Sequence, residues 1–155
     1  MAGSRKTARE FALQGLYAWL VGGAEVTLIA ANLAEDDNFK RADADWFRQL
    51  LYGVLKDEDL LSSRITPYLD RPLAELSPVE RAILLIGAYE LVSCPDVPYR
   101  VVINEGLELA KKFGGTDGHK YINGVLDKLA QEARAVEIES ARKARSEGGR
   151  VKGEG

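Results

Sequence analysis

A small group of cations lies at the start of an amphipathic segment near the N-terminus of this 155-residue chain. On a helix of about 100° per residue, Arg5, Lys6 and Arg9 fall within roughly a quarter-turn of one another, and Tyr17 lies beside them. The apolar residues collect on the opposite side, where a core would take them. An exposed face of cations and an aromatic ring suits the phosphates and unstacked bases of single-stranded nucleic acid. Taken alone, the segment slightly favours a second interpretation, an ordinary solvated face.

A second candidate lies where the glycine-rich stretch 114–118 leads into a helix. Lys120 and Tyr121 stand in the first turn, where free backbone N–H groups could bind an anion and the ring could stack on a base. Alternatively, Thr116 or Asp117 caps this helix and Tyr121 belongs to the core, and the segment alone favours that alternative. The carboxylate of Asp117 would also repel phosphate. Because the stretch follows a helix and lacks a Gly-Lys-Ser/Thr ending, we do not expect a nucleotide-binding P-loop.

The sequence gives no support for catalysis. His119 and Cys94 are the chain's one histidine and one cysteine, and their separation does not match metal-ligand spacing. No serine stands in a nucleophile-elbow context, and the acidic run 57–59 is typical of a solvated patch. We therefore predict a protein that is not an enzyme and that needs no metal and no cofactor.

Composition restricts where and how such a protein could bind nucleic acid. The net charge of −3 and the pI of about 5.3 mean that any site for a polyanion must be local. A single cysteine excludes an internal disulfide and fits a reducing compartment. No apolar run approaches the ~20 residues that span a bilayer, and residues 1–10 do not resemble a signal peptide. We expect a soluble, cytoplasmic protein with no membrane contact.

The elements that must position these residues are helices. Ser77, Pro78 and Glu80 form a capping box, which predicts a helix start followed by a run that is apolar nearly all round. Whether 43–70 is one helix or two stays open. The pattern predicts an all-α protein of about six or seven helices, with one domain over 1–137 and a disordered basic tail over 138–155. The expected helical segments are about 4–20, 26–33, 43–70, 78–92, 98–113 and 119–133.

Three motifs, in order, carry a family resemblance. They are Arg-Lys-x-Ala-Arg-Glu-x-Ala-Leu-Gln-x-Leu-Tyr at 5–17, Asp-Val-Pro-Tyr-Arg-Val-Val-Ile-Asn-Glu-Gly-Leu-Glu-Leu-Ala-Lys-Lys-Phe-Gly at 96–114, and His-Lys-Tyr-Ile-Asn-Gly-Val-Leu-Asp-Lys at 119–128. Together they closely resemble the NusB family of bacterial transcription antitermination factors, over roughly residues 4–134. Three motifs in the same order are a far more specific signal than any one of them.

The resemblance implies a compact all-helical bundle of two helical subdomains. It also implies binding of boxA RNA of ribosomal RNA leader transcripts as a heterodimer with NusE, a ribosomal protein of the small subunit. That complex joins other Nus factors on RNA polymerase and lets it read through terminators. The family's arginine-rich first helix contacts RNA, and this role transfers to Arg5, Lys6 and Arg9. Lys6 stands where the family usually has arginine, and it lacks the planar fork of a guanidinium.

The rest of the implied RNA surface comes from the last loop and helix, and transfers to Asp117, Lys120 and Tyr121. Family members often carry phenylalanine at the position of Tyr121, so stacking on a base should survive.

The implied NusE-binding surface includes the capping-box helix. It transfers to Glu80 and Arg81, with Glu75 nearby. Some family members form homodimers that cover the RNA face, so a homodimer is a further possibility.

Two other functions compete with this prediction. One is the RNA-binding module of a ribosomal RNA methyltransferase, for whose catalytic domain we expect no room in 155 residues. The other is a helical self-association or interaction protein with no RNA role, in which the cations are simply solvated. The RNA-binding prediction depends on the segments around Arg9 and Lys120 meeting in the folded molecule as one basic surface.

Overall fold

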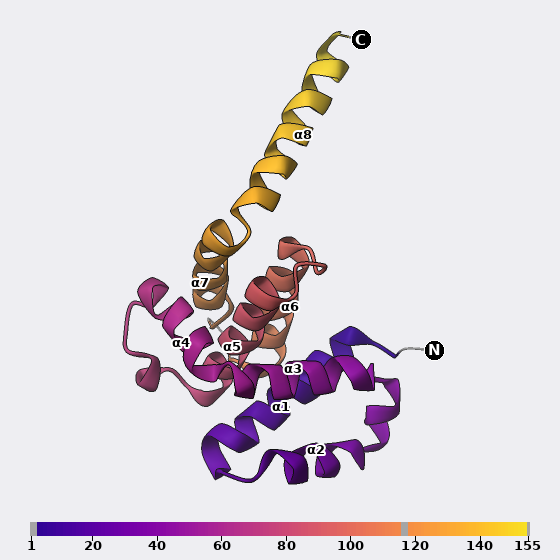
Figure 1. Cartoon of the computed structure of the whole chain (residues 1–155), viewed down its shortest axis with the longest axis vertical. Coiled ribbons are helices and arrows are strands. Elements are labelled where there is room, and N and C mark those ends of the chain that lie inside the picture. Colours follow the sequence, from indigo (N-terminus) through magenta and orange to yellow (C-terminus); the bar gives the residue numbers. More distant parts are fainter. Residues whose placement is uncertain (1–2, 116–117, 155) are drawn as a thin grey trace.

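A computed structural model describes residues 3–115 and 118–154, with side chains up to residue 147. These residues form eight α-helices and three short 3-10 helices, and contain no β-strand (Figure 1). The all-α prediction is therefore confirmed, while the expected count of six or seven helices was too low. The α-helices are α1 (Arg5–Gly22), α2 (Val26–Ala34), α3 (Ala44–Lys56), α4 (Glu58–Ile65), α5 (Pro78–Ser93), α6 (Tyr99–Phe113), α7 (Gly118–Ala133) and α8 (Ala135–Glu154). The 3-10 helices are η1 (Asp37–Arg41), η2 (Thr66–Tyr68) and η3 (Leu73–Glu75).

The start of α1 is fixed by local capping and by the chain that precedes α3. The Ser4 side chain accepts a hydrogen bond from the Thr7 amide at 3.0 Å, which satisfies one of the free donors of the first turn. The Ser4 backbone N–H donates to the Arg41 carbonyl at 2.7 Å, and its carbonyl accepts from the Asp43 amide at 3.0 Å. The basic start of α1 is therefore held in one place.

The segment 43–70, left open above, divides into two helices. α3 ends at Lys56, and α4 begins at Glu58; Asp57 between them has a φ of −103° and a ψ of 19°, which depart from helical values. The predicted capping box at the start of α5 is confirmed, because the Ser77 hydroxyl accepts from the Glu80 amide at 3.1 Å.

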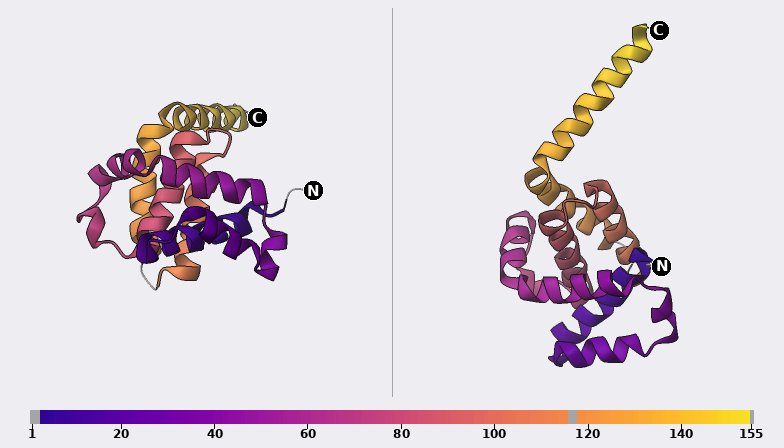
Figure 2. Two further views of the ribbon diagram at one scale, coloured as in Figure 1. Left: turned by 60° about the horizontal axis from the view of Figure 1, so that its bottom comes forward. Right: turned by 45° about the vertical axis from the view of Figure 1, so that its right-hand side comes forward.

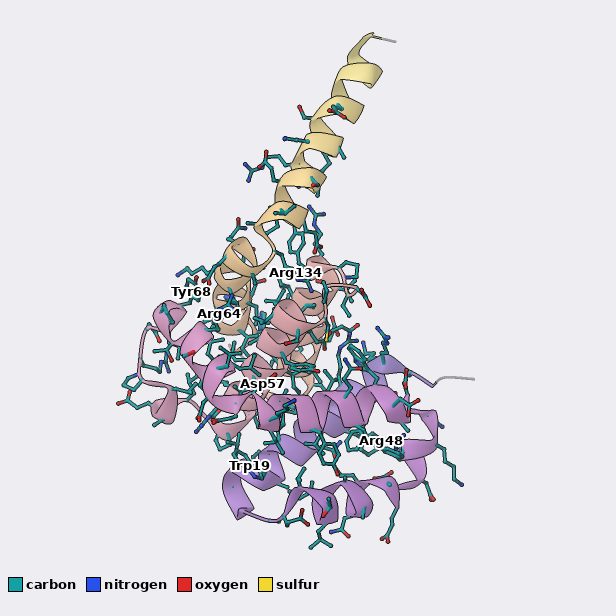
Figure 3. The ribbon with its side chains drawn as sticks, in the orientation of Figure 1. Trp19, Arg48, Asp57, Arg64, Tyr68 and Arg134 are labelled. Carbon is teal, nitrogen blue, oxygen red and sulfur yellow. The ribbon has the colours of Figure 1, made fainter. Side chains whose placement is uncertain are left out.

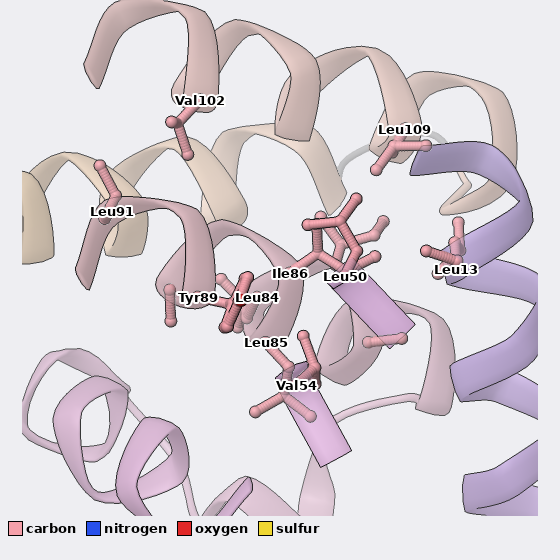
Figure 4. Close-up of a cluster of buried hydrophobic side chains, with 14 of the residues drawn as sticks. Leu13, Leu50, Val54, Leu84, Leu85, Ile86, Tyr89, Leu91, Val102 and Leu109 are labelled. Atoms are coloured by element: carbon pink, nitrogen blue, oxygen red, sulfur yellow. The ribbon is translucent and has the colours of Figure 1, made fainter. Parts of the chain in front are cut away.

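Helix α5 lies in the middle of the molecule, as its apolar composition predicts. It packs against α1, α3, α4, α6 and α7. The buried side chains labelled in Figure 4 belong to α5 itself and to α1, α3 and α6 around it. Gly53 permits the close approach of α3, because a Cβ there would lie 2.5 Å from the Tyr89 ring. Gly87 does the same for α7, because its Cβ would meet Leu126 at 2.7 Å.

The helices form two groups around this centre. α1, α2 and α3 pack together, and α4 to α7 pack together, with α1 and α3 also against α5 (Figures 1 and 2). One continuous apolar core runs through both groups. None of the helices in the described part of the chain is long and apolar enough to cross a membrane.

The C-terminal segment differs from its prediction. Composition predicts a disordered tail from residue 138, whereas the structure continues as α8, which extends away from the body (Figure 2). The first turn is anchored by the buried Ile138, and Glu139 pairs with Arg142 at 3.8 Å one turn on. With no proline to interrupt it, the segment continues the helix after its docked first turn. The proposed domain boundary at residue 137 stays a prediction.

Candidate nucleic-acid interface

The C-terminal turn of α6 connects the start of α1 with the start of α7. Lys6 and Glu10 of α1 line one groove together with Lys111 and Lys112 of α6, and Glu105 and Glu108 of α6 line it as well. The same two α6 lysines line a second hollow with His119 in the first turn of α7. The two segments singled out in the sequence are therefore joined through a third, which supplies two further cations.

We call Lys6, Lys111, Lys112 and the first turn of α7, with His119 and Lys120, the basic surface. Lys6, Lys111, Lys112 and Lys120 are all exposed. Lys112 Nζ lies 3.1 Å from Glu10 Oε2 in an ion pair at the surface. Because such pairs are weak, a phosphate could replace the Glu10 carboxylate as the partner of Lys112 at small cost in free energy. Sequence reasoning missed Lys111 and Lys112, although their position in the last turn of a helix beside a glycine-rich loop was a usable signal.

Arg5 is exposed but faces a different neighbour from Lys6. Its guanidinium lies 4.0 Å from the centre of the Trp46 ring on α3, in a cation–π contact. The charge stays open to solvent while the ring fixes its position. Arg5 is thus an exposed cation beside Lys6 in the sequence, held over the Trp46 ring.

The prediction that Arg9 is exposed is wrong. Its side chain is 4% exposed, and Nε and Nη2 donate to the two carboxylate oxygens of Glu90 on α5, at 2.7 and 2.9 Å. Burial alone would lower the pKa of Arg9, but the hydrogen bonds and charge of Glu90 outweigh it and raise the pKa. Arg9 joins α1 to α5 and does not reach the surface, because a carboxylate buried in α5 needs a cationic partner.

A second buried arginine, Arg134, was also missed in the sequence and completes this charged cluster (Figure 3 labels Arg134). Arg134 lies between α7 and α8 and donates to the carbonyls of Glu90, Leu91 and Cys94 at 2.7–3.0 Å. It thereby satisfies the acceptors that the last turn of α5 leaves free. Burial raises the pKa of the neighbouring Cys94 thiol to about 11. The signal in the sequence was Glu90 itself, one carboxylate within an apolar run.

Tyr17 lies farther along α1, in an apolar groove. The ring is 44% exposed, and the groove of about 420 Å³ is also lined by Leu33, Val79 and Phe113. Phe113 connects this groove to the basic surface, because Lys112 Nζ lies 5.5 Å from the centre of its ring. Sequence reasoning had placed Tyr17 beside the cations and had not singled out Phe113 as a site residue.

Tyr121 is half-buried and packs against the core, so the alternative that it is a core residue is correct in part. Its hydroxyl accepts from the Asp70 amide at 3.2 Å, and the Arg71 guanidinium lies 4.9 Å from the centre of its ring. Burial also raises the pKa of Tyr121. Asp117, the third residue predicted here, lies outside the described residues.

The residues predicted to bind a partner protein surround the start of α5. Glu75 is exposed at the end of η3. The Ser77 hydroxyl also donates to Glu80 Oε1 at 2.9 Å, and Arg81 Nη2 lies 3.0 Å from Glu58 Oε1. Glu80 and Arg81 therefore already have partners within the chain, and Glu75 is the most open of the three.

No group of His, Cys, Asp and Glu side chains in the described ranges could hold a metal ion. The arrangement offers exposed cations, one apolar groove lined by Tyr17 and Phe113, and an acidic helix start, which are components of a binding surface.

Comparisons with known proteins agree in one family. The model of the NusB family matches residues 6–131. A transcription antitermination protein NusB from Thiobacillus denitrificans is 78% identical over 143 residues, covering 92% of this chain and 99% of its own length. A crystal form of T. maritima NusB has a TM-score of 0.76 at 27% identity, covering 85% of this chain and 94% of that one. A crystal structure of the antitermination factors NusB and NusE in complex with dsRNA also has a TM-score of 0.76 at 27% identity, covering 83% and 96%.

Proposed function

The chain belongs to the NusB family, and we propose that it acts in transcription antitermination by binding boxA RNA of ribosomal RNA leader transcripts as a heterodimer with NusE. The heterodimer would act with other Nus factors on RNA polymerase, in the bacterial cytoplasm. The role is regulatory and requires no catalytic group. The observation that carries the RNA-binding part is the basic surface, where α1, α6 and α7 bring exposed cations together in an acidic protein.

The basic surface accounts for affinity through phosphate contacts. Lys6, Lys111, Lys112 and Lys120 lie within it, and Arg5 stands at its edge. Three or four phosphate contacts with a single strand would give a log–log salt slope of about −2 to −3. So few contacts support modest affinity, which is a physical reason for a partner that extends the surface.

Aromatic rings supply the contacts to bases. Tyr121 is in the first turn of α7, beside Lys120, and its half-exposed ring could stack on one base where Arg71 now lies. Asp117, also in this region by sequence, would weaken phosphate binding by repulsion.

The groove around Tyr17 suits the partner protein. It is apolar, ends at Val79 in the first turn of α5, and so adjoins Glu80 and Arg81. An apolar groove with charged groups at its rim is the usual composition of a protein–protein interface. We therefore place NusE on this groove and on Glu75, Glu80 and Arg81, next to the RNA.

The test is RNA binding by the purified protein with and without NusE, using boxA RNA and a scrambled RNA of the same composition. We expect NusE to strengthen binding to boxA more than to the scrambled strand. Since one structural neighbour was crystallised with dsRNA, a boxA duplex is a third probe, and we expect the single strand to bind more tightly. Equal binding to all three RNAs in the presence of NusE contradicts the proposal.

The competing function, an interaction protein with no RNA role, predicts a different result. Replacing Lys6, Lys111 and Lys112 with alanine would then leave RNA binding and antitermination unchanged. Light scattering, which measures molar mass, would show whether the chain forms a homodimer that could cover the basic surface. A matched control replaces Lys56 of α3 and Lys128 of α7, which are exposed elsewhere.

A further inference from the structure

We propose that the groove between the start of α6 and helix α8 is a second RNA subsite, which holds single-stranded RNA flanking the boxA element without reading its sequence. The proposal rests on the function proposed above. The groove has a volume of about 400 Å³ and is lined by Pro98, Tyr99, Arg100, Ala141, Ala144 and Arg145, together with Glu137. Its α8 wall, from Glu137 to Arg145, lies outside residues 6–131, over which the family model matches.

The base of α8 is held firmly enough to form one wall of a groove. Arg134 donates to three carbonyls at the end of α5, and Ile138 is buried. Glu137 Oε2 accepts from the Tyr99 amide at 2.9 Å, which ties α8 to the first turn of α6. The position of α8 relative to α6 is therefore fixed at this end, and the helix extends from it (Figure 1).

The chemistry of the groove matches single-stranded nucleic acid. Tyr99 offers a half-exposed ring, and Arg100 and Arg145 are exposed cations on opposite walls. Arg100 Nε donates to the Tyr99 hydroxyl at 3.2 Å, so this cation is held beside the ring. The acidic group in the groove, Glu137, is already paired with Arg134 Nη1 at 2.5 Å. Surfaces that bind single strands without sequence preference combine an aromatic ring, on which a base stacks, with cations that bind the phosphates. The groove has both.

Charge continues from the groove along α8. Arg142 and Lys143, which stand between Ala141 and Ala144 on the same turn, are exposed as well. Residues 140–155 contain five of the chain's 21 Lys and Arg residues but two of its 24 Asp and Glu residues. The rest of the chain is acidic, so this segment attracts a polyanion that the remainder of the surface repels.

The separation of the two surfaces determines which RNA can use both. The basic surface lies at the C-terminal end of α6 and the groove at its N-terminal end, so about 22 Å of helix separates them. Arg5, the residue before Lys6, is exposed and lies over the Trp46 ring at 4.0 Å from its centre. An RNA strand that runs from the basic surface past Arg5 would therefore reach the groove only if the RNA is longer than the boxA element bound at the basic surface.

The experiment compares two RNAs in the presence of NusE: boxA alone, and boxA extended at both ends by unstructured single strand. The variant is Arg142→Gln/Arg145→Gln, because glutamine keeps the helix propensity while it removes the charge. We expect several-fold weaker binding of the extended RNA, a log–log salt slope shallower by about 1.4, and unchanged binding of boxA alone. The matched control is Arg48→Gln/Lys56→Gln on α3, far from α8 (Figure 3), which should bind both RNAs as the unmodified chain does.

Three results would overturn the subsite. They are unchanged binding of the extended RNA, equal loss with both RNAs, or unchanged RNA binding together with loss of an acidic protein partner, which would assign the groove to that partner. Circular dichroism and thermal melting of both variants exclude a folding defect. If the unmodified chain binds boxA no better than a scrambled strand, the proposed function fails, and the effect of flanking RNA is judged separately.

Discussion

Lys6 and Arg9 are one turn apart on α1, yet they lie in opposite surroundings. Lys6 is exposed on the basic surface, whereas Arg9 is buried against Glu90 in the charged cluster beside Arg134. Both regions contain cations, but those at the surface are solvated by water and those in the interior are not. At the surface a cation remains free to bind a phosphate, whereas in the interior its hydrogen bonds are already used by the protein.

This difference separates a structural role, held by the buried cations, from an RNA-binding role, proposed for the exposed cations. The sequence alone did not distinguish the two. The buried cluster fixes how α1, α5 and α7 meet, and the basic surface depends on that arrangement. Removing a buried cation should therefore cost stability first, and removing an exposed cation should cost RNA affinity alone. The following predictions test this separation, from the largest expected effect to the smallest.

Arg9→Ala should lower the free energy of unfolding by about 3–5 kcal/mol, because it leaves the Glu90 carboxylate buried and unpaired. Urea unfolding followed by circular dichroism measures the loss. The double variant Arg9→Met/Glu90→Leu should recover most of it, because apolar groups of similar volume replace the pair. It should also retain RNA affinity, and a stable double variant that no longer binds RNA would show that Arg9 contacts the RNA after all.

Tyr121→Ala should weaken RNA binding by about 1–3 kcal/mol, the scale for the loss of one stacked base. The control Tyr121→Phe keeps the ring and removes the hydroxyl that accepts from Asp70, so it should bind nearly as well as the unmodified chain. Fluorescence anisotropy with labelled boxA RNA measures both. If the alanine variant loses helicity together with affinity, the ring serves the core and the stacking role is wrong.

Lys111→Gln/Lys112→Gln should have the smallest effect, a salt slope shallower by about 1.4 with little change in stability. The surface pair between Lys112 and Glu10 contributes little, because exposed ion pairs are worth about 0–1 kcal/mol. Titrations at several salt concentrations give the slope, with Arg48→Gln/Lys56→Gln as the charge-matched control. An unchanged slope would remove the end of α6 from the RNA surface.

The helices were predictable because local signals specify them. The Ser77 capping box and the apolar run of α5 each act within a few residues, and both appear in the structure. The break at Asp57 carried no such signal, because Asp57 makes no side-chain capping hydrogen bond. The helical form of 138–154 was missed because composition does not reveal that the first turn of α8 is docked.

The site was predictable only where exposure follows from helical periodicity. That rule is correct for Lys6 and Tyr17, but it fails for Arg9, because its partner Glu90 lies 81 positions away in the sequence. Periodicity places a residue on a face of its own helix and says nothing of which helix covers that face. Lys111 and Lys112 were overlooked for the same reason, since their proximity to Lys6 arises from tertiary packing.

The most direct test is lysine acetylation footprinting by mass spectrometry, with and without boxA RNA, in the NusE heterodimer. Lys6, Lys111, Lys112 and Lys120 should be protected together when RNA binds, while Lys56 and Lys128, which are also exposed, should react as before. Protection of Lys6 without Lys120, or of neither, would show that α1 and α7 do not share one RNA surface and would contradict the account.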